Sequence, residues 1–378
     1  MLLVSEPVLG ADEKAALAAV IDSGWVTMGD RVHEFEQVFA RMHGAEDSIA
    51  VGSCTAALHL ILHALGIGPG DEVLVPSLTF VATANAVLYV GARPVFVDVE
   101  STAVPLMSLD EARAKCTSRT KAVILVHFAG YLADRHAWQT FARSKGLLLV
   151  EDAAHAPGLP AVGTFGDAAA FSFYGNKNMT TAEGGAIITR SRALSDTIRR
   201  ARSHGMTSNT RQRLACRRPD YDVTILGFNY RMDELRAAVG LVQLRKLPAW
   251  NDIRRHLSHC YRQLILELCP SVMVPFDASW LSAHHLLPIV VPKAIGRQSL
   301  IDRLRERGIQ TTVHYPPVHR LTFYNDLYPD TALPITEDFA QRELTLPLHP
   351  GMTPADVEYV VNSLATALGA PVPTSAVA

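Results

Sequence analysis

The chain has 378 residues, with 35 basic and 37 acidic side chains and a formal net charge of −2 at pH 7. A nearly neutral chain has no overall field that would favour nucleic acid or an anionic membrane surface, so any anion must be bound locally. Because single hydrophobic cores stop growing near roughly 250 to 300 residues, a chain of this length is expected to form two lobes.

The first residues, MLLVSEPVLGADEKAAL, reach Glu6, Asp12 and Glu13 before any long apolar run and contain no basic region, which argues against a secretion signal. No stretch is apolar for long enough to be expected to span a bilayer. The five cysteines are scattered and include no C-x-x-C pair, so neither a disulfide framework nor a zinc site is expected. We therefore expect a cytoplasmic protein with no metal and with neither a membrane nor a nucleic acid as partner.

Short β-branched runs alternate with helix-period segments over the first half of the chain. Strands are expected over residues 71–77, 92–99, 121–128, 146–153, 168–173 and 184–190. Helices are expected between several of them, over residues 53–66, 80–91 and 134–146. This alternation is typical of a mainly parallel sheet covered by helices.

The pattern changes after Arg190. Long helical segments are expected over residues 191–203, 230–247 and 250–268. Strand-like runs follow, HLLPIVVP at 285–292 and IQTTVHY at 309–315, around a helix expected over 297–308. We expect a large α/β domain over residues 1–249, which includes the N-terminal segment, and a smaller C-terminal α+β domain over residues 250–378.

Chemically distinctive side chains follow two of the expected strands, at the edge where ligand sites form in open α/β sheets. Asp152 ends the run GLLLVED, and a buried acid there needs a partner such as a protonated pyridine nitrogen. Lys177 follows the run AAAFSF, and its amine could form a Schiff base if desolvation or a neighbouring cation lowered its proton affinity. Together, the lysine, the aspartate and a pyridine nitrogen describe pyridoxal 5′-phosphate (PLP).

Two further segments could hold such a cofactor. A helix start with free N–H groups favours a phosphate, and here it carries the small or hydroxylated residues Ser53, Cys54, Thr55 and Ala56. Phe80 could offer an apolar face to the ring. Each feature alone has an ordinary explanation, such as a helix cap, a core position, an ion pair or a solvated turn. Their joint order along the βα units favours the cofactor interpretation.

Seven blocks of this sequence resemble, in the same order, the DegT/StrS-type sugar aminotransferases, a family of fold-type-I PLP enzymes. The blocks lie between about Ser23 and Val361 and read SGWVTMGDRVHEFEQVFA, VGSCTAALHLIL, DEVLVPSLTFVATANAVLYVGARPVFVDV, VEDAAHA, FSFYGNKNMTTAEGG, GFNYRMDELRAAVGLVQL and LTLPLHPGMTP. The resemblance implies an α/β fold with a mainly parallel seven-stranded sheet, PLP as cofactor and aminotransferase activity.

The resemblance also implies roles for individual residues. Lys177 would form the Schiff base with the cofactor, and Asp152 would pair with the pyridine nitrogen. Phe80 would stack on the ring, and His155 would lie near its phenolic oxygen.

The phosphate would be held by Ser172 and by the amides of Thr55 and Ala56. Asn229, in GFNYRM, matches the residue that family members lend to the phosphate in the neighbouring subunit, so the resemblance implies a homodimer with shared active sites. The alternative is that Asn229 only caps the helix that follows it.

The implied reaction moves an amino group from an amino acid, glutamate or glutamine, to a nucleotide-linked keto sugar, in amino-sugar biosynthesis for glycans or a secondary metabolite. A keto-cyclitol acceptor, a PLP-dependent sugar dehydratase and a non-catalytic PLP-binding regulator stay open. Lys177 argues against the dehydratases, which often have histidine at the lysine position.

Substrate contacts are expected from three segments. The arginine-rich run over residues 199–218, which includes Arg211, could bind the diphosphate of a nucleotide-linked sugar or could be a solvated helix end and loop. The segment HYPPVHRLTFY offers His314, Tyr315 and His319, and GWVTMG offers Thr27 to the site of the other subunit.

The chain departs from the family pattern at two positions of these blocks. Many members have glycine where this chain has Cys54 and Ala182. If either position requires a positive φ, the side chain present here would be strained.

Overall fold

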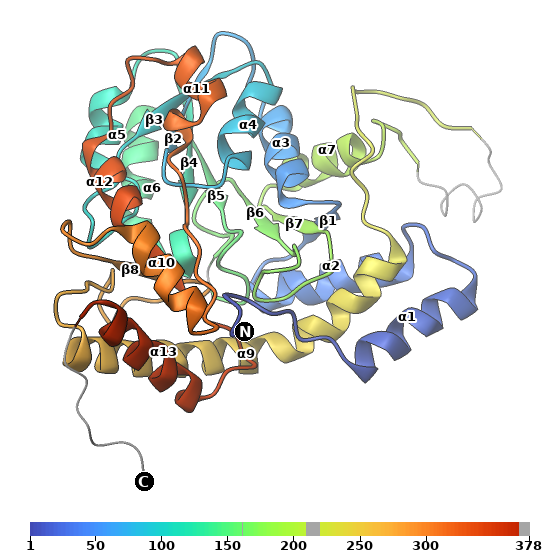
Figure 1. Ribbon diagram of the computed structural model, residues 1–378. Helices are drawn as coiled ribbons and strands as arrows, with labels where there is room; N and C mark the ends of the chain where they lie inside the picture. The colour runs from blue at the N-terminus through green and yellow to red at the C-terminus, as the bar shows by residue number, and fades with distance from the viewer. Residues whose placement is uncertain (161, 209–219, 370–378) are drawn as a thin grey trace.

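The structure is a computed structural model that describes residues 1–160, 162–208 and 220–369. Its elements form a large sheet between layers of helices, with a smaller layer beside it (Figure 1). The strands are β1 (Ser48–Val51), β2 (Glu72–Pro76), β3 (Arg93–Val97), β4 (Thr120–Val126), β5 (Leu148–Asp152), β6 (Ala168–Ser172), β7 (Gly185–Ile188), β8 (Leu287–Val290) and β9 (Glu343–Leu346). The helices before residue 209 are α1 (Ala11–Ser23), α2 (Asp30–Met42), α3 (Cys54–Ala64), α4 (Ala82–Tyr89), α5 (Leu109–Lys115), η1 (Phe128–Gly130), α6 (Arg135–Lys145) and α7 (Arg192–Arg202). The helices after residue 219 are α9 (Glu234–Leu268), α10 (Arg297–Glu306), η2 (Val318–Arg320), α11 (Thr322–Leu327), α12 (Pro334–Arg342) and α13 (Pro354–Ala367).

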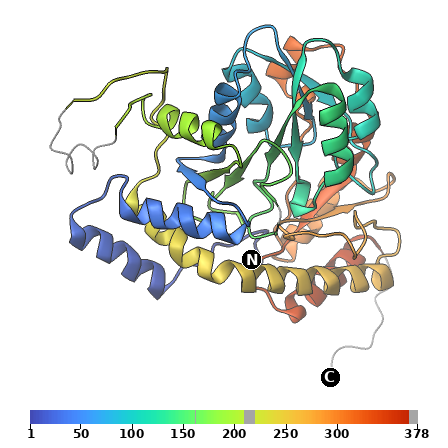
Figure 2. The ribbon, with the colours of Figure 1, turned by 180° about the vertical axis from the view of Figure 1, so that it is seen from behind.

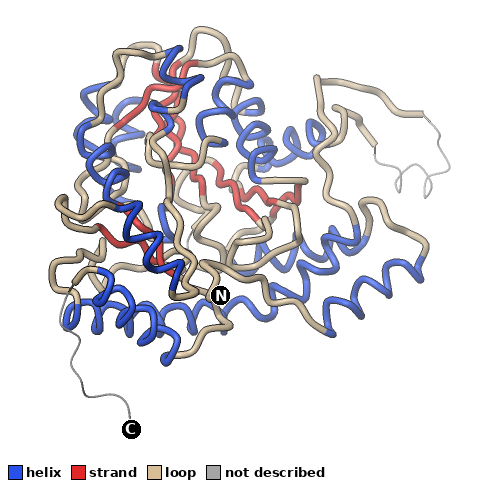
Figure 3. The backbone as a smooth tube through the Cα atoms, viewed as in Figure 1, coloured by secondary structure: helices blue, strands red, loops and turns tan. Residues whose placement is uncertain are grey.

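The large sheet has seven strands in the order β1-β7-β6-β5-β4-β2-β3, the longer of the two groups of red strands in Figure 3. Parallel pairing joins β3, β2, β4, β5 and β6 in turn. Strand β7 is antiparallel to both of its neighbours, β6 and β1. The sheet is therefore mainly parallel and seven-stranded, which confirms the expected fold class.

Successive residues of the strands enter different cores, because side chains alternate between the two faces of a sheet. On one face Val73 and Val75 of β2 pack in a core shared with α3, α4 and α7. On the other face Leu74 of β2 and Val123 of β4 pack in a core shared with α5 and α6. Helix α2 and the first half of α9 cover the β6–β7–β1 side of that face. Both views of the ribbon show α9 running below the sheet (Figures 1 and 2).

A smaller layer surrounds the second half of α9. Strands β8 and β9 pair antiparallel, and Ile289 and Leu346 share a core with Tyr261 of α9, Leu300 of α10 and Val360 of α13. Helix α9 thus contributes to the cores of both layers. The division into domains at residue 249 stays a prediction, and it falls inside this helix.

Three expected elements, two helices and one strand, differ from the structure. The two helices expected over residues 230–247 and 250–268 are a single helix, α9, which continues through Pro248. Proline removes one backbone donor and favours a break, but buried Leu247 and Leu257 hold the two halves against their cores. The strand expected over residues 309–315 was wrong as well, because this segment makes only isolated bridges, between Leu2 and Ile309 and between Thr312 and Thr345. Among the described helices, none is long and apolar enough to cross a membrane.

Candidate active site

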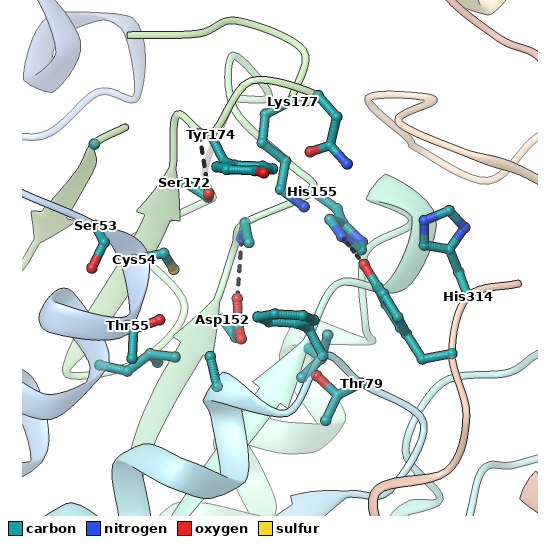
Figure 4. Close-up of a pocket in the computed structure, with 18 of the residues that line it drawn as sticks. Ser53, Cys54, Thr55, Thr79, Asp152, His155, Ser172, Tyr174, Lys177 and His314 are labelled. Atoms are coloured by element: carbon teal, nitrogen blue, oxygen red, sulfur yellow. Dashed lines mark hydrogen bonds between the residues drawn. The ribbon is translucent and has the colours of Figure 1, made fainter. Parts of the chain in front are cut away.

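A cavity of about 400 Å³ opens at the edge of the large sheet where the parallel strands end. The turns after β1, β2, β5 and β6 form its walls, together with the chain before η2 (Figure 4). Most of the predicted site residues line it, namely Ser53, Cys54, Thr55, Phe80, Asp152, His155, Ser172, Lys177, His314 and Tyr315. Residues as far apart in the sequence as Ser53 and Tyr315 therefore line one cavity.

Two predicted residues from nearby segments lie outside this cavity. Ala56 donates its N–H to Ser53 Oγ at 3.1 Å, so this amide is already satisfied within the chain. His319 is buried, with Nδ1 at 2.7 Å from Ser77 Oγ and Nε2 at 3.0 Å from Glu337 Oε1. These contacts tie η2 to the turn after β2, and they make His319 a structural residue rather than a substrate contact.

The residues expected to act in a neighbouring subunit lie around a second cavity of about 510 Å³. Thr27 is exposed and lines this cavity. Asn229 is exposed and forms an isolated bridge with Ser203, which also lines it. Asn229 does not cap the following helix, because the N-cap of α9 is Asp233. Arg211 lies outside the described residues.

Asp152 is the last residue of β5, and its side chain points into the cavity (Figure 4). Thr83 Oγ1 donates to Asp152 Oδ2 at 2.7 Å, and the Ala154 amide donates to Oδ1 at 3.2 Å. Burial raises the pKa of Asp152, although these hydrogen bonds oppose the shift. No cation in the described part of the chain lies within hydrogen-bond reach of this buried carboxylate, so its charge calls for a positive partner in the cavity.

Lys177 follows β6 and extends into the same cavity (Figure 4). Burial lowers the pKa of Lys177 to about 8, while Asp152 and Cys54 oppose the shift. A lysine amine that loses its proton near pH 8 can attack a carbonyl carbon, which a protonated amine cannot do. The site therefore contains an amine suited to Schiff-base chemistry in the same cavity as a buried acid that has no hydrogen-bonded cation among the described residues.

The start of α3 forms the wall opposite these two residues. Ser53 is the N-cap, and the amides of the first helical residues, Cys54 and Thr55, have no intrahelical acceptor. Gly185 of β7 allows this helix start to approach the sheet, because a Cβ at this position would lie 2.6 Å from the Ser53 carbonyl carbon and 2.7 Å from Cys54 N. Ser172 ends β6 and lines the same wall. Free amides and hydroxyls at a helix start are a suitable place for a phosphate.

Aromatic and imidazole rings line the remaining side. Phe80 is 58% exposed although it lines the cavity, so one ring face is free to stack on a flat ligand. His155 Nδ1 accepts from the Ala129 amide at 3.2 Å. Burial, and then Lys177, hold the pKa of His155 well below its usual value, so the neutral ring carries its proton on Nε2. That nitrogen donates to Tyr315 Oη at 3.0 Å.

Several residues of this site were not predicted from the sequence. Tyr174, Asn176 and Glu183 line the cavity, and all three belong to the segment that holds Lys177. Thr79 lines it as well and lies 2.8 Å from Thr83, oxygen to oxygen. Thr79 lies in the bend before α4 and Thr83 lies within α4, so their contact depends on how the chain turns into this helix.

Cys54 and Ala182, the two positions at which many family members have glycine, differ in backbone conformation. Ala182 has φ +68°, in the left-handed region that disfavours a side chain. Cys54 is the first residue of α3 and has no positive φ. The strain expected from these substitutions is therefore present at Ala182 and absent at Cys54.

The described residues fit PLP by their chemistry. A buried carboxylate lacks a cationic partner, a lysine amine is desolvated, a helix start presents free amides, and an aromatic face is exposed, all around one cavity. Within the described ranges, no group of three or more His, Cys, Asp or Glu side chains could hold a metal ion. Together, fold and cavity define a PLP-dependent enzyme of fold type I.

Comparison with known proteins gives the family. The model of the DegT/DnrJ/EryC1/StrS aminotransferase family matches residues 7–365. The chain belongs to this family, and it is a PLP-dependent aminotransferase.

Solved structures with the same fold cover nearly the whole chain. The aminotransferase TlmJ from Streptoalloteichus hindustanus is 34% identical, with a TM-score of 0.90 over 98% of this chain and 99% of that one. PseC from Helicobacter pylori, an aminotransferase involved in the biosynthesis of pseudoaminic acid, is 28% identical, with a TM-score of 0.90 over 97% of this chain and 99% of that one. NtdA from Bacillus subtilis, with bound cofactor PMP, is 31% identical, with a TM-score of 0.87 over 95% of this chain and 81% of that one.

Proposed function

We propose that the enzyme transfers the amino group of glutamate or glutamine to the keto group of a nucleotide-linked sugar. The observation that carries the reaction type is the cavity in which the desolvated amine of Lys177 and the buried carboxylate of Asp152 lie together. The similarity to PseC, an aminotransferase of an amino-sugar pathway, supports a sugar acceptor.

The bound cofactor supplies an electron sink for the carbanion that forms when the donor loses its Cα proton. The protein supplies orientation and proton transfer. When Lys177 is not joined to the cofactor, its free amine takes the proton from the donor Cα and returns it at C4′ of the cofactor. Asp152 keeps the pyridine nitrogen protonated, because a buried carboxylate favours a cationic partner. The same steps run in reverse on the keto acceptor, so ping-pong kinetics are expected.

Other side chains of the cavity hold the cofactor in this proposal. Phe80 stacks on the ring, and His155 lies near the phenolic oxygen. Ser172 and the Thr55 amide bind the phosphate, at the helix start that Ser53 caps.

We propose further that the active enzyme is a homodimer whose sites are shared. Neither Thr27 nor Asn229 lines the cavity that holds Lys177 in its own chain. Thr27 lines a second cavity, and Asn229 bridges to Ser203, which lines that second cavity. A two-fold dimer could bring each set to the cavity of the other subunit, because an isologous interface places equivalent residues symmetrically.

Two of the arginines expected to meet a diphosphate already have acidic partners. Arg202 contacts Glu36 at 2.6 Å, and Arg199 contacts Glu36 at 2.8 Å and Asp47 at 2.6 Å. These contacts fasten α7 to α2 and the start of β1, so Arg199 and Arg202 already have partners within their own chain.

The test is turnover with a panel of acceptors. Purified enzyme with PLP and glutamate or glutamine is given nucleotide-linked 3-keto and 4-keto sugars, the corresponding free sugars, and a keto-cyclitol, and amino products are identified by mass spectrometry. We expect an amino product from a nucleotide-linked sugar, and none with Lys177→Ala. Exclusive use of the cyclitol, dehydration without amine transfer, or cofactor binding without any turnover would each contradict the proposal.

A further inference from the structure

His285, which the sequence analysis did not select, contacts the amine of Lys177. Its Nε2 lies 3.5 Å from Lys177 Nζ, a long hydrogen-bonding distance. The residue precedes β8 and is 5% exposed. Its backbone N–H donates to the Ala129 carbonyl at 3.0 Å, so the loop that carries the ring is held next to η1. The smaller layer thus reaches the reactive lysine through one imidazole.

The hydrogen bonds behind the ring determine which imidazole nitrogen carries the proton. His285 Nδ1 lies 2.8 Å from Asn178 Oδ1. The amide nitrogen of Asn178 donates to the Ala283 carbonyl at 2.8 Å and to Asn251 Oδ1 at 2.9 Å. Asn251 is oriented in turn by its donation to the Pro157 carbonyl at 3.1 Å. Because carbonyl oxygens only accept, both amides have a single orientation, and Asn178 Oδ1 must accept the proton of His285 Nδ1.

The nitrogen that faces Lys177 therefore carries a lone pair. Burial, and then the neighbouring His155 and Lys177, hold the pKa of His285 well below its usual value, so the ring stays neutral and Nε2 stays an acceptor. The rings of His155 and His285 lie 4.3 Å apart between centroids. One neutral imidazole thus contacts the lysine and the other contacts Tyr315.

We propose that His285 is a positioning residue that accepts an N–H of Lys177 whenever the lysine is not joined to the cofactor. The bond keeps the freed amine in the cavity and leaves its lone pair directed away from His285, toward the substrate. It also stabilises the ammonium that forms when Lys177 takes up a proton. Two backbone carbonyls, acting through Asn251 and Asn178, fix the imidazole in the form that this role requires. The inference rests on the proposed role of Lys177 as the proton-transfer group.

Other titratable groups surround the amine of Lys177 and also influence its pKa. Asp152 and Cys54 interact with Lys177 from β5 and α3, and His155 and His314 interact with it from the other walls. Glu183, Tyr174 and Tyr315 also line the cavity. A change at His285 must therefore be compared with a change at a nearby buried residue that leaves this set intact.

His284 provides the matched control. It is equally buried and adjacent in sequence, but its ring packs against Tyr131 at 5.8 Å between centroids, whereas the ring of His285 contacts Lys177. His284→Phe tests the cost of altering this loop, whereas His285→Phe removes the acceptor of the lysine as well. His285→Gln keeps an acceptor oxygen near the position of Nε2.

The first readout is the titration of Lys177 in the full-length, cofactor-free protein, followed by acetylation of its peptide as a function of pH and quantified by mass spectrometry. Since a neutral acceptor stabilises the ammonium more than the amine, His285→Phe should lower the apparent pKa of Lys177. His285→Gln should largely restore it, and His284→Phe should leave it unchanged. This titration needs neither amine donor nor sugar. Its result therefore does not depend on whether the proposed keto sugar is the substrate of the enzyme.

The second readout is the half-reaction of the holoenzyme with glutamate, followed by stopped-flow absorbance. Loss of positioning should slow proton transfer about 10- to 100-fold in His285→Phe with little change in donor affinity, while His285→Gln should recover most of the rate. The third is 15N NMR of histidine-labelled wild-type protein, in which His285 should carry its proton on Nδ1. A proton on Nε2, or identical behaviour of His285→Phe and His284→Phe in the first two measurements, would overturn the inference.

Discussion

Thr83 donates its hydroxyl hydrogen to Asp152 across 2.7 Å and so connects α4 to the last residue of β5. Because this proton is committed to the carboxylate, the 2.8 Å contact between Thr79 and Thr83 must be a donation from Thr79 to Thr83. The hydroxyl of Thr79, in the turn after β2, and that of Thr83, in α4, therefore orient the acid at the end of β5. The two hydroxyls hold the carboxylate in place without any positively charged side chain. The negative charge of Asp152 can therefore pair with the protonated pyridine nitrogen of the cofactor.

Asp152→Asn removes this charge while keeping the size of the side chain. We expect the variant to bind PLP but to lose about 10²- to 10⁴-fold in turnover, because a neutral amide cannot keep the pyridine nitrogen protonated. The control is Thr83→Val, which removes one hydrogen bond but leaves the carboxylate, and its loss should be much smaller. Steady-state kinetics on cofactor-saturated enzyme measure both, and near-normal turnover of Asp152→Asn would refute the role.

Glu343, at the start of β9, is a buried acid outside the reaction that should make stability depend on pH. It accepts from the His314 amide at 2.9 Å and from Thr345 Oγ1 at 2.5 Å, and burial raises its pKa from 4.5 to about 8. Between these two values the unfolded chain releases the proton and the folded chain keeps it. The stability contributed by this group is therefore complete below pH 4.5 and is lost as the pH rises to about 8.

Glu343→Gln should remove this loss, since the glutamine does not titrate. The free energy of unfolding of the variant, relative to wild type, should increase between pH 5 and pH 8 in urea titrations. Glu267→Gln, at an exposed position of α9, controls for the removal of a carboxylate. A difference between Glu343→Gln and wild type that is constant over this range would contradict the assignment.

Ala182 has φ +68° next to the segment that carries Lys177, and its amide donates to Thr180 Oγ1 at 2.9 Å. A side chain in the left-handed region costs roughly 1–2 kcal/mol, and a change to glycine would remove this cost. Part of that stabilisation would be lost again, because glycine has greater conformational freedom in the unfolded chain. Ala182→Gly should therefore stabilise the protein by about 1 kcal/mol. Urea unfolding measures the change, and Ala18→Gly in α1, an exposed helical position, should instead destabilise by about 1 kcal/mol. Equal signs for the two substitutions would rule out strain at Ala182.

The fold could be predicted from the sequence where local pattern and tertiary structure agree. The runs ending in Asp152 and preceding Lys177 are short, apolar and buried on both faces, as central parallel strands are. Asp152 and Lys177 were identifiable because polar residues directly after such strands converge at one edge. The break expected between residues 247 and 250 was wrong, since the local preference of Pro248 for a break is outweighed by packing along α9.

His285 and Glu343 could not be identified from the sequence alone. A histidine in AHHLLP and a glutamate in QRELTL have ordinary local surroundings. Their burial and their partners depend on how the smaller layer packs against the large sheet, which no periodicity encodes. His319 was expected near the cleft as a substrate contact, with the alternative that a lone histidine beside prolines is structural, and its contacts to Ser77 and Glu337 favour that alternative.

The last prediction concerns the shared site. Asn229 is exposed, lies outside the cavity that holds Lys177 in its own chain, and is not the cap of α9. If it contacts the phosphate in the neighbouring subunit, Lys177→Ala and Asn229→Asp chains should complement each other. In a heterodimer, the site with wild-type Lys177 would then receive its Asn229 from the Lys177→Ala chain. An equal mixture should recover up to about a quarter of wild-type turnover, since half of the dimers are mixed and each has one intact site.

The two variants are first shown to be inactive or strongly impaired alone, and subunit exchange is verified by native mass spectrometry of differently tagged chains. The control variant is Asn325→Asp, which makes the same change of side chain on α11. Chains with this substitution should be active on their own, before they are mixed with Lys177→Ala chains. If Asn229 acted within its own chain, every mixed dimer would have a defect in both sites, and activity would not return after exchange. Full activity of a verified monomer would contradict the shared site equally, because each cavity would then be complete within one chain.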